Sequence, residues 1–125
     1  MHCHSTCSDG ALAPAEVAAA AVARRVEVFA LTDHDTCAGS DEARPEGAVC
    51  VRAVEISCQD QMRSVHVLAY DTGGEWGLLE ARLGAVRDAR RRRLRVMAAR
   101  LVQRGIRIDV EGDAAARLLA WLKIE

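Results

Sequence analysis

Residues 26–31 read VEVFAL and lead directly into the polar run TDHD at residues 32–35. A short, apolar, β-branched run of this kind predicts a buried strand that ends in a polar tip. Residues 49–56 (VCVRAVEI) and 64–70 (SVHVLAY) predict two further strands, and the polar residues 59–61 between them favour a hairpin. These three strands and the polar residues at their ends decide the fold.

Helices are predicted on either side of the strands. Residues 14–25 begin with Pro14 and carry Glu16 in the first turn, which is typical of a helix start. Glycine and proline allow only a brief helix within residues 36–48, and apolar residues at steps of three and four predict a long helix over residues 76–104, ended by Gly105. We also expect a short strand at 106–110 and a helix at 114–124. This order favours an α/β domain.

Composition narrows the class of protein. A chain of 125 residues and 13.5 kDa allows one small domain. The net charge of −1 excludes polyanion binding by bulk charge alone. No apolar run approaches the roughly 20 residues of a membrane span, and the N-terminus does not resemble a secretory signal. The five cysteines lack a paired CxxC spacing, so we expect reduced thiols in a cytoplasmic protein.

Side chains that bind metals occur in the polar tips. His2 and His4 are two residues apart, so in extended backbone they point to the same side and could grip one divalent ion. Asp9 precedes a glycine that permits a sharp turn, and His34 lies between Asp33 and Asp35 where the first predicted strand ends. A pair of histidines at this spacing is a weak signal alone.

Two ionisable side chains lie inside predicted strands. Glu55 interrupts an otherwise apolar strand, and His66 occupies the middle of the next one. A buried carboxylate costs several kcal/mol unless a cation or hydrogen-bond donors compensate it. Glu55 could instead lie at a strand edge facing water, and His66 could be an ordinary core histidine. Together with the polar tips, however, the two residues predict a metal site.

These motifs resemble those of a known family. The run HCHSTCSDG at residues 2–10, then LTDHDT at 31–36, VEIS at 54–57 and HVL at 66–68 resemble the first motifs of the PHP (polymerase and histidinol phosphatase) domain. The resemblance is nearest to bacterial PHP phosphoesterases that act on 3′,5′-nucleoside bisphosphates and on short 5′-phosphorylated RNA or DNA ends. It implies an α/β fold, the N-terminal part of a distorted, TIM-like (β/α)₇ barrel over residues 1–110, and leaves 111–125 as an unassigned C-terminal helix or tail.

The resemblance also implies a ligand set and a reaction. Two or three divalent ions (manganese, zinc, iron or magnesium) would be bound by six residues: His2, His4, Asp9, His34, Glu55 and His66. Asp33 and Asp35 would orient His34 without binding metal. The implied reaction is hydrolysis of a phosphate ester by metal-activated water.

Arg90 falls on the apolar stripe of the long predicted helix, where a charged side chain is unexpected. Its stem could simply cover the core, with the guanidinium reaching water. The alternative hypothesis is that Arg90 contacts the substrate phosphate, with Arg93 as a weaker second candidate. The other arginines of this helix would form a solvated face or contact a nucleic-acid backbone.

The chain departs from the family pattern at both ends. The strand that normally precedes the first histidine pair is missing, and no histidine follows His66. We therefore expect a truncated barrel with weak activity or none, unless self-association or a complementing chain completes the site. Two alternatives remain open: a non-catalytic zinc module built from Cys3, Cys7 and the first two histidines, and a nucleic-acid-binding protein that uses the arginine-rich helix.

Overall fold

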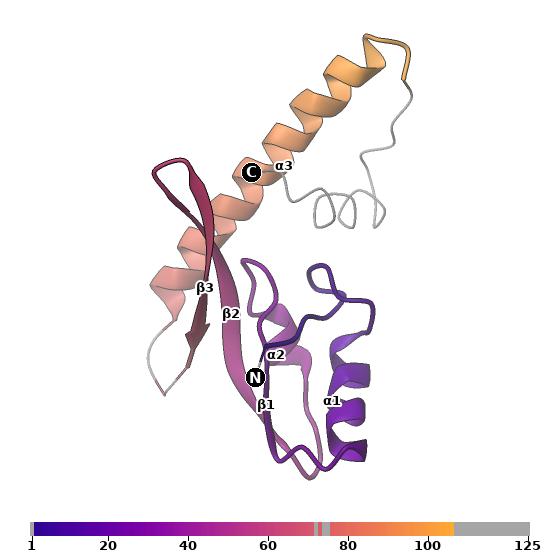
Figure 1. Cartoon of the computed structure of the whole chain (residues 1–125), viewed down its shortest axis with the longest axis vertical. Helices are drawn as coiled ribbons and strands as arrows, with labels where there is room; N and C mark the ends of the chain where they lie inside the picture. Colours follow the sequence, from indigo (N-terminus) through magenta and orange to yellow (C-terminus); the bar gives the residue numbers. More distant parts are fainter. Residues whose placement is uncertain (1, 72, 74–75, 107–125) are drawn as a thin grey trace.

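A computed structural model describes residues 2–71, 73 and 76–106. Within these residues the chain forms a three-stranded sheet in the order β1-β2-β3, with helices α1, α2 and α3. The strands lie side by side, α1 lies beyond β1, and α3 runs along the hairpin of β2 and β3 (Figure 1). This mixed α/β arrangement agrees with the predicted class.

The elements have the following bounds: α1 Pro14–Ala23, β1 Val28–Leu31, α2 Ala38–Glu42, β2 Val49–Asp60, β3 Arg63–Tyr70 and α3 Gly77–Val102. β1 pairs parallel to β2 through the connection that contains α2, and β2 pairs antiparallel to β3. The predicted hairpin is confirmed, but β2 is longer than predicted. It continues to Asp60 because each residue from Ala53 onward has a partner in β3.

Two small apolar clusters hold the helices against the sheet. Phe29 and Leu31 of β1 pack with Ala18 of α1 and Ala43. Farther along, Val54 packs with Leu83 of α3 and with Cys37. Since both clusters use alternate residues of their strands, the helices cover one face of the sheet, and the intervening residues face the other side.

The long helix matches its prediction closely, and its turn beyond Val102 contains Gly105, whose φ of 81° is in the left-handed region that glycine adopts without strain. Its C-terminal end extends beyond the sheet (Figure 1). No helix in the described part of the chain is both long and apolar enough to cross a membrane. The strand predicted at 106–110 falls almost wholly outside the described residues, and the helix predicted at 114–124 falls entirely outside them.

Candidate metal centre

The N-terminal segment is held beside β1 by its backbone. The N–H of Thr32, just after β1, donates to the carbonyl of Cys3 at 2.8 Å. The chain then turns back so closely that a Cβ on Gly10 would lie 2.4 Å from the carbonyl of His4. Only glycine fits such an approach. His2 and His4 are thereby brought to the carboxyl end of β1.

Asp33 fastens this turn to the end of the strand. Asp33 is 1% exposed. Its carboxylate accepts hydrogen bonds from the Ser5 N–H at 2.7 Å, the Ser5 hydroxyl at 2.7 Å and the Ser8 hydroxyl at 2.6 Å. Sequence reasoning expected Asp33 to orient His34. Its hydrogen bonds instead go to the loop that carries the first ligands, because that loop presents buried donors that need a charged acceptor. Ser5 itself was missed, since a lone serine gives no signal in the sequence.

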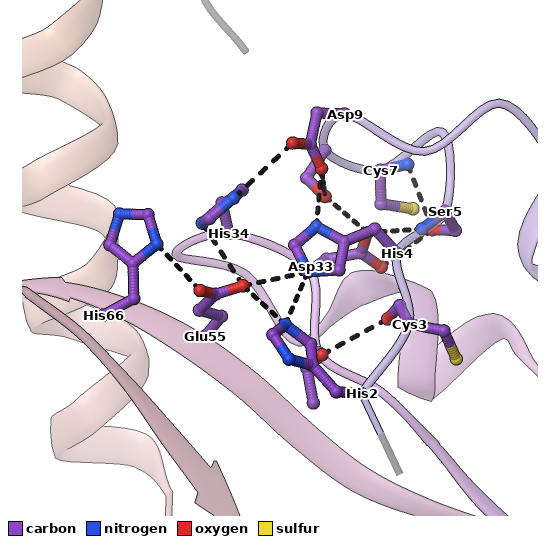
Figure 2. A network of polar contacts seen from close by, with 12 residues as sticks. His2, Cys3, His4, Ser5, Cys7, Asp9, Asp33, His34, Glu55 and His66 are labelled. Atoms are coloured by element: carbon purple, nitrogen blue, oxygen red, sulfur yellow. Dashed lines mark hydrogen bonds and ion pairs between the residues drawn. The ribbon is translucent and has the colours of Figure 1, made fainter. Parts of the chain in front are cut away.

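Glu55 is the centre of the cluster (Figure 2). Its Oε2 lies 2.9 Å from Nε2 of His2 and 2.8 Å from Nε2 of His4, while Oε1 lies 2.8 Å from Nδ1 of His66. Nδ1 of His34 lies 3.8 Å from Oε2. Glu55 is 5% exposed, so it does not face water at a strand edge. Four imidazoles from three parts of the chain therefore meet at one buried carboxylate.

His66 reaches this centre from the neighbouring strand. Its strand partner is Ser57, two residues beyond Glu55, so both side chains leave the same face of the hairpin. The His66 side chain is 35% exposed, which does not fit a core histidine. Sequence alone left this alternative open, because the pairing of two strands decides which side of the sheet a residue faces.

Asp9 completes the cluster on the side away from the sheet. Its Oδ1 contacts Nδ1 of His4, and its Oδ2 lies 3.6 Å from Nε2 of His34 (Figure 2). Burial opposes ionisation of this carboxyl, but the hydrogen bond and the charge of His4 outweigh it, with a smaller contribution from His34. The pKa of Asp9 is therefore below its usual value.

Burial and neighbouring groups also set the pKa values of Glu55 and His34. Burial opposes the charged form of Glu55, yet its contact with His2 and the nearby imidazoles lower the pKa of Glu55. Burial also lowers the pKa of His34, and the carboxylates of Glu55 and Asp9 only partly offset that effect. A deprotonated carboxylate beside a neutral imidazole is the state in which both can bind a metal.

The donor set fits divalent ions. Three groups have ligand atoms within 4.8 Å of one another, and they share members: His2, His4 and Glu55; His4, Asp9 and His34; His34, Glu55 and His66. Nδ1 of His34 is buried without a hydrogen-bond partner among the described residues. An orphaned buried nitrogen facing a carboxylate is what a bound cation would satisfy.

The cysteines do not join this cluster. Among the described residues, none of the groups that could hold a metal contains a cysteine. The Cys3 thiol donates to the carbonyl of Ala30 and lies against the apolar cluster under α1. The geometry therefore gives no support to a zinc module built on Cys3 and Cys7.

Asp35 connects the cluster to α3. It is 1% exposed, has a positive φ of 54°, and accepts a hydrogen bond from the Ser57 N–H at 2.8 Å. Arg90 forms an ion pair with Asp35 at 3.0 Å, and the Arg87 guanidinium donates to the Asp35 carbonyl. Like Asp33, Asp35 was expected to orient His34 and instead binds other groups, namely β2 and α3. Arg87 was missed, although it lies one turn before Arg90.

The two arginines proposed for phosphate binding are placed differently. Arg90 forms an ion pair with Asp35, which follows His34 in the sequence, and the Arg90 side chain remains 40% exposed. Arg93 is exposed, and no contact links it to the cluster within the described part of the chain. The structure thus brings the six candidate ligands together and places Arg90 against Asp35, the residue after His34.

Known proteins are similar to this chain in sequence. A 5′-3′ exoribonuclease of Haemophilus influenzae is 35% identical over 119 residues, covering 92% of this chain and 43% of that protein. A 3′,5′-nucleoside bisphosphate phosphatase of Chromobacterium violaceum is 37% identical over 110 residues, covering 85% and 39%. The chain is homologous to bacterial phosphoesterases. It spans about two fifths of their length and matches their N-terminal part.

Solved structures extend this homology to the fold. A structure described as an amidohydrolase from Chromobacterium violaceum matches with a TM-score of 0.70 and 36% identity, covering 86% of this chain and 39% of that one. One described as a metal-dependent phosphoesterase from Bifidobacterium adolescentis matches with a TM-score of 0.72 and 34% identity, covering 82% and 37%. No protein-family model matches the chain. The resemblance predicted from the motifs is confirmed, and the three-stranded sheet corresponds to a fragment of these phosphoesterase folds.

Proposed function

We propose that this chain carries the N-terminal half of a PHP-type, metal-dependent phosphoesterase site that hydrolyses phosphate esters of nucleotides or short oligonucleotides. The observation that carries the proposal is the convergence of His2, His4, His34 and His66 on the buried carboxylate of Glu55. Relatives named for nucleoside bisphosphates and for RNA support the substrate class.

The ligand roles follow from the three overlapping groups. His2, His4 and Glu55 would hold one divalent ion, and Glu55 would bridge it to a second that His66 also binds. Asp9 and His34, with His4, would hold a third. When bound, divalent ions would supply a water molecule of lowered pKa and would screen the negative charge of the phosphoryl oxygens. The relatives support metal dependence, and manganese, zinc, iron and magnesium all accept this mixture of nitrogen and oxygen ligands.

Arg90 is proposed to bind the substrate phosphate. Asp35 fixes one side of its guanidinium at 3.0 Å, while the exposed remainder has further N–H donors available. A planar guanidinium held in this way can donate two parallel hydrogen bonds to a phosphate. Arg93 lies one turn farther along α3 and would meet a phosphate beyond the reacting one.

We further propose that residues 1–110 correspond to the first part of a distorted (β/α)₇ barrel. The parallel β1–β2 pair and the helices on one face of the sheet support this assignment. The relatives are more than twice as long as the region they share with this chain.

The experiment separates metal binding from turnover. Manganese is titrated into the metal-free chain by calorimetry, for the wild type, Glu55→Gln and an exposed control, Asp60→Asn. We expect Glu55→Gln to weaken binding at least 10-fold and Asp60→Asn to leave it unchanged. Phosphate release from a 3′,5′-nucleoside bisphosphate is then measured with manganese present, for the wild type and His34→Ala. Equal manganese affinity in Glu55→Gln and the wild type would refute the proposal, and so would turnover that His34→Ala leaves unchanged.

A further inference from the structure

Helix α3 contains several arginines that have no acidic partner in the described part of the chain. Arg87 and Arg90 reach Asp35, and Arg91 pairs with Asp88 on the same helix. Five other arginines of the helix are exposed and have no acidic partner within 4.0 Å among the described residues: Arg82, Arg92, Arg93, Arg95 and Arg100. Unpaired guanidinium groups at this density repel one another, so an external anion would stabilise them.

Three of these five arginines lie on one flank of the helix. Arg82 and Arg93 are eleven residues apart, about three turns, and Arg93 and Arg100 are seven apart, about two turns. The two acidic residues of α3, Glu80 and Asp88, fall on other sides of the helix by the same periodicity. We call Arg82, Arg93 and Arg100 the arginine stripe. It is a row of positive charge about 27 Å long without an intervening carboxylate.

One member of the stripe, Arg93, lies close along the helix to Arg90. Arg93 follows Arg90 by about one turn, and Arg90 contacts the aspartate next to His34. At about 3.4 Å per nucleotide, a 27 Å row spans roughly eight steps of a stacked strand. α3 contains no aromatic residue, so the helix offers charge for phosphates and no ring on which a base could stack.

We propose that the arginine stripe binds the sugar–phosphate backbone of a single-stranded nucleic acid whose phosphorylated end lies in the metal site. The inference rests on the proposed function, which supplies a nucleotide substrate, and it selects an oligonucleotide over a mononucleotide. A single row of charges follows one backbone, and binding is independent of base sequence. The positive charge of the stripe is local, since the whole chain has a net charge of −1.

The test measures binding of a 5′-phosphorylated, 3′-fluorescent oligouridylate of about 10 nucleotides by anisotropy at several salt concentrations. EDTA is present throughout, so metal ligation does not contribute. The double variant Arg93→Ala/Arg100→Ala is compared with Arg92→Ala/Arg95→Ala, which removes the same charge from the other flanks of the same helix. We expect the negative slope of log K against log salt to become shallower by about 1.4 for the stripe variant, which is about 0.7 for each lost phosphate contact. For the control variant we expect less than half of that change.

Three results would overturn the inference: absent binding, equal slope changes in the two double variants, or equally stripe-dependent binding to vesicles of phosphatidylglycerol. Circular dichroism of each variant checks that α3 remains folded. Failure of the proposed function looks different. Loss of manganese dependence or of hydrolysis would leave the slope difference in EDTA untouched. Equal slope changes in the two double variants would refute the stripe and leave the manganese affinity of the wild-type chain unaffected.

Discussion

Removing the Asp33 carboxylate should release the ligand-bearing loop from β1. Asp33 and Ser5 are both fully buried, and the two Ser5 donors each lie 2.7 Å from the carboxylate. Leaving a buried donor without a partner costs about 1–3 kcal/mol, so Asp33→Ala should lower the free energy of unfolding by about 2–6 kcal/mol. Ser8 is less buried, and water can replace its bond. Asp33→Asn keeps one acceptor oxygen and should cost about 1–3 kcal/mol.

Urea unfolding followed by circular dichroism measures this difference, with exposed Asp60→Asn as the control. A small domain has about 5–15 kcal/mol of stability, so the asparagine variant should remain folded even where the alanine variant does not. Manganese titration of Asp33→Asn provides the second measurement. We expect affinity to fall 10–100-fold although Asp33 is not a ligand, because His2 and His4 lose their anchor. The reasoning is refuted if Asp33→Asn matches Asp60→Asn in both stability and manganese affinity.

The thiols and glycines provide further tests. Burial and, to a smaller extent, the neighbouring Glu80 raise the pKa of Cys37 from 9.0 to about 12, so at pH 8 a thiol reagent should modify exposed Cys58 and spare Cys37 until the chain unfolds. Since the unfolded thiol ionises first, the contribution of Cys37 to stability should decline as the pH rises from about 9 to 12, and Cys37→Ala should flatten that decline. A Cβ on Gly39 would lie 2.0 Å from an oxygen of Asp33, so Gly39→Ala should lower the melting temperature through a loss of about 1–3 kcal/mol. Gly77→Ala has open space and serves as its control; equal melting temperatures of the two variants would contradict this packing.

Local sequence predicted the elements well because each run has a clear period. The predicted elements are present, with ends displaced by a few residues: a helix at 14–25, a strand at 49–56 and a long helix at 76–104. The largest difference is the end of β2 at Asp60, because hairpin pairing extends a strand through polar residues that have no strand signal of their own. The exact end of a strand depends on its partner.

The candidate metal ligands were predictable because their chemistry conflicts with their surroundings. A buried glutamate inside an apolar strand costs free energy unless a cation or hydrogen-bond donors compensate its charge. The structure brings this glutamate and the histidines of the polar tips close to one another. The roles of Asp33 and Asp35 were not predictable in this way. Both flank His34 in sequence, yet each side chain turns toward a different partner that only the folded chain brings near.

Sequence by itself therefore determined the α/β class, the six candidate ligands and the resemblance to PHP phosphoesterases, because these depend on residue types and on short-range spacing. Tertiary structure decided that Glu55 is the common centre and that Asp33 holds the first loop. It also decided that Arg90 pairs with Asp35, the residue after His34. These outcomes depend on strand register, on backbone close enough to require glycine, and on the direction of each side chain, all of which join residues that are distant along the chain.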